Sequence, residues 1–114
     1  MNQDIEINIF RALDFIRDNA PAYAKAKAER IYLDEFRKTK KALCMKTAEV
    51  RGTTAISAQE RDAYADAEYG ELLLSLRTAV EEEERLRWLM VAAQARIEVW
   101  RTIEANRRAE AKTL

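Results

Sequence analysis

Hydrophobic residues in the second half of the chain follow a regular alternation of steps of three and four residues. The positions are Tyr69, Leu72, Leu76, Ala79, Glu83, Leu86, Met90, Ala93, Ile97, Trp100 and Glu104. This spacing is a heptad seam that continues for about five heptads, so it predicts one very long helix at about residues 69–111.

Further apolar residues widen the seam to a broader stripe. They are Leu73, Val80, Leu89, Val99 and Ile103. A helix with so wide an apolar stripe contacts two or more neighbours, so we expect an oligomeric bundle. The residues expected at the oligomer interface are Leu72, Leu76, Leu86, Met90, Ile97 and Trp100.

The first half of the chain predicts shorter helices. Helical spacing of apolar residues predicts one at about 4–18, which ends before Pro21 because the residue before a proline is pushed out of the helical conformation. A second helix is expected at 21–51, with Gly52 as its C-terminal cap. The capping-box sequence from Ser57 to Glu60 predicts a third at 57–67, separated from the long helix by a break that we attribute to Gly70.

The second helix has two different faces. Its apolar stripe, which we expect to pack on a neighbour, consists of Tyr32, Phe36, Leu43 and Val50. Its basic face consists of Lys27, Arg30, Arg37, Lys38 and Lys41, with Tyr23 on the same side. Cations beside an aromatic ring suit a phosphate backbone and its bases, so these six are the candidate nucleic-acid-binding residues. The alternative is a face that is basic only to remain solvated.

Composition and charge agree with one all-α domain over residues 1–114. The chain has two glycines and one proline, too few for many turns, and its net charge is zero. That zero is a cancellation, since residues 21–51 carry nine basic and four acidic groups while residues 60–85 carry three and nine. Such segregation suits either charge matching between helices or a basic surface for a polyanion.

Catalytic chemistry finds little support in the sequence. The absence of histidine removes the Ser-His-Asp and Cys-His mechanisms and the commonest zinc sites, so we expect no enzyme, no metal site and no cofactor. Cys44 is expected to be a packed thiol. The acidic run at 81–84 is expected to be a solvated face, with Glu83 as a polar break in the seam that sets register or oligomeric state.

No stretch of the chain approaches the roughly 18 uninterrupted apolar residues of a membrane span. The first residues carry Asp4 and Glu6 where a signal peptide would be basic. We therefore expect a cytoplasmic protein with no membrane partner.

A resemblance extends these expectations. The lysine-rich stretch at 32–43, the tyrosine-containing arm near 64–69, and the Leu-Arg-Trp and Ile-Glu-Val-Trp-Arg sequences at 86–88 and 97–101 resemble small helical proteins of tailed phages. More loosely, the chain is similar to the phage recombination mediators. That resemblance implies a homo-oligomer in the cytoplasm of a bacterial host that binds single-stranded DNA and assists a recombinase. It places the DNA contact on Lys27, Arg30, Arg37, Lys38 and Lys41.

An alternative function can be inferred from the heptad seam alone. In that interpretation the chain is a helical protein-binding scaffold or an assembly chaperone without nucleic-acid binding. The basic face would then contact the acidic segment 60–85 of a neighbouring chain.

Overall fold

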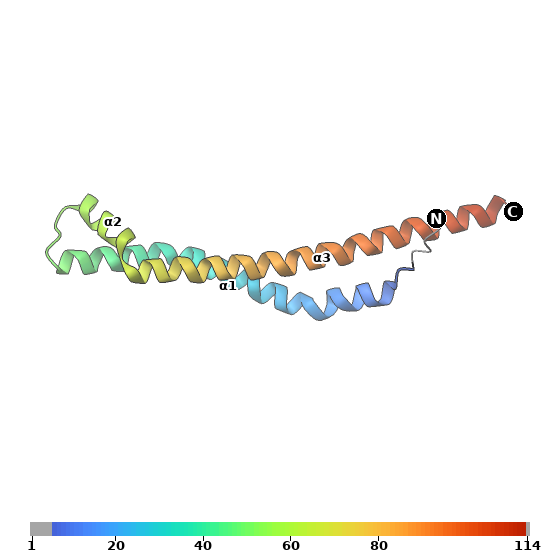
Figure 1. The fold of residues 1–114 in the computed structure, drawn as a ribbon, viewed down its shortest axis with the longest axis horizontal. Helices are drawn as coiled ribbons and strands as arrows, with labels where there is room; N and C mark the ends of the chain where they lie inside the picture. The colour runs from blue at the N-terminus through green and yellow to red at the C-terminus, as the bar shows by residue number, and fades with distance from the viewer. Residues whose placement is uncertain (1–5, 114) are drawn as a thin grey trace. The chain divides into compact units, whose positions relative to one another are not determined.

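The computed structural model describes residues 6–113, and every regular element among them is an α-helix (Figure 1). The helices are α1 at Ile9–Val50, α2 at Ile56–Ala65 and α3 at Ala67–Thr113. The all-helical class and the very long C-terminal helix are therefore confirmed. Asp4 and Ile5, the start of the helix expected at 4–18, lie outside the described residues.

Contacts between the helices fall into two units. One, the hairpin unit, is Ala24–Glu84, and the other, the end unit, joins Met1–Tyr23 to Arg85–Leu114. Each unit contains a stretch of α1 and a stretch of α3, and the hairpin unit also contains α2. The single all-helical domain at 1–114 stays a prediction.

The break expected between the first two helices is absent, because α1 runs through Pro21 without ending. A proline inside a helix cannot donate to the carbonyl four residues before it, here Arg17. Two residues before the proline, the Asn19 side-chain amide donates to the Phe15 carbonyl oxygen at 2.9 Å. The helix therefore continues past a missing hydrogen bond, which a long helix with many other bonds can tolerate.

α1 ends at the position that Gly52 predicts. Gly52 has a φ of +106°, in the region that side chains with a Cβ rarely adopt. The Thr53 amide donates to the Ala48 carbonyl and the Gly52 amide to the Glu49 carbonyl, both at 3.0 Å. These two bonds form a Schellman motif, so Gly52 ends the helix as expected.

The turn between α2 and α3 has a different cause from the expected one. Gly70 lies inside α3, whereas Asp66 is extended, with φ −66° and ψ +133°, and its Oδ1 accepts the Glu68 amide at 2.8 Å. Asp66 is thus the N-cap of α3. The capping box expected at Ser57 is absent too, because α2 begins one residue earlier and has Ala55 as its cap, with no side-chain hydrogen bond.

The heptad seam of α3 is the face that the protein covers. Every seam position from Tyr69 to Glu104 is buried or half-buried. The six buried residues of α3 all lie on the seam, at Tyr69, Leu72, Ala79, Glu83, Leu86 and Ala93. The periodicity read from the sequence therefore gives the orientation of this helix.

In the hairpin unit, α1 does not turn its expected apolar stripe toward α3. Tyr32, Leu43 and Val50 are 60%, 51% and 82% exposed, and only Phe36 is half-buried. The buried positions are instead Cys44 and Ala48, and Ala26, Arg30, Leu33 and Lys40 are among the half-buried ones. These recur at near-heptad spacing, so α1 has a second seam made mostly of small and charged residues.

Candidate interaction surface

One ion pair crosses the seam of the hairpin unit. The guanidinium of Arg30 on α1 donates to both carboxylate oxygens of Glu83 on α3, with Nε–Oε2 2.6 Å and Nη2–Oε1 3.1 Å. The Glu83 side chain is 9% exposed and that of Arg30 is 31% exposed. A two-bond contact of this kind fixes direction as well as distance, so the pair aligns the two helices at this point.

Two further cations of α1 contact the acidic segment that follows. Lys40 Nζ lies 2.9 Å from a carboxylate oxygen of Glu68, and this hydrogen bond raises the pKa of Lys40 against the opposing effect of desolvation. Lys41 Nζ lies 4.8 Å from the centre of the Tyr64 ring and 3.6 Å from Glu60. Its pKa is raised, first by a hydrogen bond to Tyr64. The basic face of α1 and the acidic segment 60–85 therefore meet within one chain.

The six candidate nucleic-acid-binding residues do not form one exposed surface. Tyr23, Arg30 and Lys41 are half-buried, and the last two have the carboxylate contacts just described. Arg37 and Lys38 are exposed but each lies 3.4 Å from an acid three residues earlier on the same helix, Asp34 and Glu35. Lys27 is exposed.

The residues expected at an oligomer interface are partly covered inside the chain. Leu72 and Leu86 are 9% and 4% exposed, and Leu76, Met90, Ile97 and Trp100 are half-buried. Their role in contacts with a second copy stays a prediction. The surface still open to a partner lies elsewhere on the helices.

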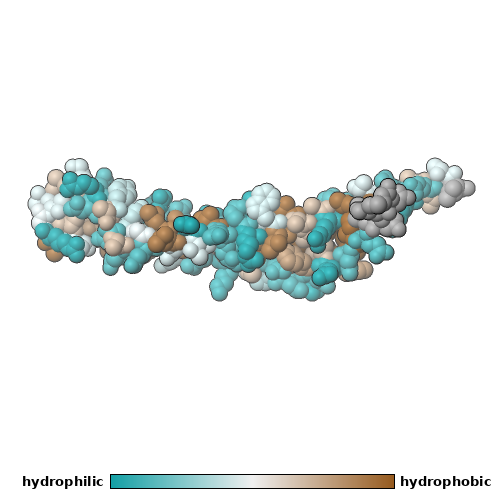
Figure 2. All heavy atoms as spheres, viewed as in Figure 1, coloured by the Kyte–Doolittle hydropathy of each residue, from teal (hydrophilic) through white to brown (hydrophobic). Residues whose placement is uncertain are grey.

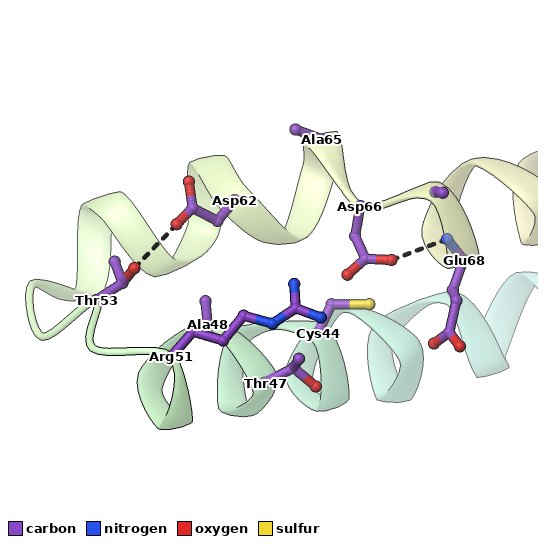
Figure 3. A pocket seen from close by; sticks show the side chains of 10 residues that line it. Cys44, Thr47, Ala48, Arg51, Thr53, Asp62, Ala65, Asp66 and Glu68 are labelled. Carbon is purple, nitrogen blue, oxygen red and sulfur yellow. Dashed lines mark hydrogen bonds between the residues drawn. The ribbon is translucent and has the colours of Figure 1, made fainter.

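A small core holds α2 against the hairpin. It consists of Cys44 from α1, Ala63 from α2 and Tyr69 from α3, with Met45 packed beside them. The Tyr69 ring also meets that of Tyr64 edge-on, with centroids 5.5 Å apart. Figure 3 shows this end of the hairpin from the side, with Cys44 on α1 opposite the turn at Asp66.

Cys44, Asp66 and Glu68 bring three possible metal-ligand atoms within 4.8 Å of one another. Each is already engaged in a way that needs no metal. Burial raises the pKa of the Cys44 thiol, and Asp66 raises it further. Asp66 caps α3, and Glu68 holds the Lys40 ammonium. A protonated thiol is a poor metal ligand and a poor nucleophile, so the arrangement supports a packed cysteine.

Cys44 should react slowly with a thiol reagent in the folded protein, because the side chain is 4% exposed and its pKa is raised. At pH 8 we expect the rate with a disulfide reagent to increase by at least about tenfold when the protein is unfolded in urea. The colour released by the reagent measures both rates. Equal rates with and without urea would show that the α2 core is open.

Large hydrophobic side chains lie on the outside of the protein, among them Leu73, Val80, Leu89 and Val99, which the sequence places beside the seam. Fifteen of them are exposed among the described residues, whereas only Tyr69, Leu72 and Leu86 are buried. Trp88 is 59% exposed, with the Arg87 guanidinium 4.5 Å from its ring centre. Figure 2 shows apolar areas between hydrophilic ones along the face in view.

No helix among the described residues is long and apolar enough to cross a membrane. Comparison of the chain with protein-family models, with curated proteins and with solved structures gives no match. The likeness to phage recombination mediators thus remains a prediction from the sequence.

Proposed function

We propose that this chain is a self-associating helical scaffold that acts through protein contacts, without catalysis or nucleic-acid binding. The observation that carries the proposal is that, within residues 6–113, fifteen large hydrophobic side chains are exposed and three are buried. Soluble proteins rarely leave so much apolar surface without a partner. Burial of these side chains against other helices would provide the main favourable free energy of assembly.

The pairing of charges inside the chain supports the same proposal. Arg30, Lys40 and Lys41, three cations of the basic helix, have acidic partners on α2 or α3. Binding of a DNA phosphate by these groups would require breaking those contacts. The function as a recombination accessory stays a prediction, and of its five cations Lys27, Arg37 and Lys38 are exposed.

Light scattering over a range of protein concentrations tests the scaffold directly. We expect a mass of at least two chains at micromolar concentration and no change in the fluorescence anisotropy of a labelled single-stranded oligonucleotide at low salt. A mass of one chain at every concentration would overturn the proposal. Anisotropy that rises with protein and falls steeply with added salt would favour the recombination accessory, because phosphate contacts release counterions.

A further inference from the structure

Pro21 divides α1 into two stretches. A proline has no amide hydrogen, so the Arg17 carbonyl loses its helical partner, and the proline ring crowds the same carbonyl. A proline inside a helix costs about 3 kcal/mol relative to an alanine. The helix is therefore weakest at this point, and we call the stretch before it, residues 9–20, the strap.

Little buried surface holds the strap in place. It belongs to the end unit, where it packs with the part of α3 that begins at Arg85. Ala12 is the buried residue of the strap, and alanine has a small side chain. The two large side chains Phe10 and Leu13 are 74% and 47% exposed. The half-buried positions are Ile9, Phe15, Ile16 and Asn19. Apolar burial therefore stabilises the strap less than a fully buried seam would.

Among residues 6–113, the polar contacts of the strap's side chains lie within α1 itself. Arg17 lies 3.4 Å from Asp14 and 3.0 Å from Asp18. The hairpin unit differs, because its stretch of α1 is joined to α3 by the ion pair between Arg30 and Glu83. The strap is therefore the less firmly held of the two stretches of α1.

We propose that the strap opens from α3 as one unit, with Pro21 as its hinge. The hydrogen bond that would resist bending at Arg17 is already missing, and the contacts with α3 that must break are few. A helix as short as the strap is marginal in water by itself, so the opened stretch loses much of its helical structure. The opening is a local transition of one chain and does not depend on the proposed scaffold function.

The opening uncovers the seam of α3 in the end unit. Ala93 is 5% exposed there and Ile97 is half-buried, and the strap is the helical stretch of that unit that packs with this part of α3. Ile97 is one of the residues expected at an oligomer interface. A closed strap thus keeps this part of the seam from a second copy, and an open strap makes it accessible.

Amide hydrogen exchange of the whole chain tests the opening. We expect residues 13–20 of the wild type to exchange together, at least about tenfold faster than residues 34–48 of the same helix. Pro21→Ala restores a donor for the Arg17 carbonyl, so it should slow exchange at 13–20 by at least about tenfold and leave exchange at 34–48 unchanged. Equal exchange of the two stretches would overturn the proposal. Exchange that slows steadily from residue 13 to residue 20 and does not respond to Pro21→Ala would indicate fraying from the helix start, and the hinge would be wrong.

Two equally buried positions give a second test, because Ala12 and Cys44 are both 4% exposed. In Ala12→Cys, the introduced thiol should react with a disulfide reagent at least about tenfold faster than Cys44, each rate being divided by that of the same thiol in urea. Mass spectrometry of the labelled peptides separates the two rates. Adding Pro21→Ala should slow the introduced thiol alone.

A low, constant protein concentration prevents assembly from adding protection, and circular dichroism confirms that each variant is helical. Equal normalised rates at the two thiols, with and without Pro21→Ala, would contradict the opening. A wild-type monomer in light scattering would overturn the scaffold but leave this inference standing.

Discussion

Replacing Glu83 by alanine should lower the free energy of unfolding by about 2–3 kcal/mol, because it leaves the Arg30 guanidinium beside the seam without its principal carboxylate contact. The Glu83 side chain is 9% exposed and accepts two hydrogen bonds from Arg30. We expect a smaller loss than for a fully buried pair, because water reaches the Arg30 side chain, which is 31% exposed. Urea unfolding followed by circular dichroism measures the change, at one fixed concentration since assembly adds to apparent stability.

Glu81→Ala is the matched control for this change. Glu81 belongs to the same acidic run but is exposed, so its replacement should change the free energy of unfolding by no more than about 0.5 kcal/mol. A third protein, Arg30→Leu with Glu83→Leu, should recover most of the lost stability, since an apolar pair leaves no buried charge. If Glu83→Ala were as mild as Glu81→Ala, the pair would contribute nothing to the hairpin.

The same pair bears on how the hairpin selects its register. The two buried positions of α1 in the hairpin unit, Cys44 and Ala48, are small, and small residues pack in several registers at similar cost. A slip by one heptad would place Glu83 opposite Tyr23 in one direction and opposite Arg37 in the other, in place of Arg30. In the Tyr23 direction, the free energy of a buried, unpaired carboxylate disfavours the slipped register more strongly than packing does.

The long helix is the part of the fold that the sequence predicts best. Its seam from Tyr69 to Glu104 extends over many turns, and each position is buried or half-buried. Over a repeat of this length, a single charged residue at a seam position, such as Glu83, does not obscure the apolar pattern. Local signals were weaker guides, because Gly52 ends α1 as expected whereas Pro21 does not interrupt it.

The contacting face of α1 could not be read from hydrophobicity. The most apolar stripe, with Tyr32, Leu43 and Val50, is exposed, and the covered face includes Arg30 and Lys40. Which face is covered depends on the partner helix, whose acidic residues Glu68 and Glu83 match those cations. A rule that considers one helix at a time cannot include that match, so the basic face by itself leaves both a polyanion and an acidic helix open as partners.

Tyr69→Ala should lower the free energy of unfolding by about 3 kcal/mol, because it removes the largest side chain of the core that joins all three helices. Tyr69 is 6% exposed and forms that core with Cys44 and Ala63. Its loss leaves a cavity beside Ala63, which is fully buried, and removes the edge-on contact with the Tyr64 ring. Urea unfolding at constant protein concentration gives the value.

Tyr69→Phe keeps the ring and removes only the hydroxyl group. It should lower the free energy of unfolding by no more than about 1 kcal/mol. The effect of Tyr69→Ala can also be measured locally through the reaction rate of Cys44. The loosened core should expose Cys44 to the thiol reagent while the far part of α3 stays helical. A large loss of stability with unchanged Cys44 reactivity would mean that Tyr69 stabilises α3 alone. Loss of both together would show that α2 is held to the hairpin through this one small core, since α2 itself buries only Gln59 and Ala63.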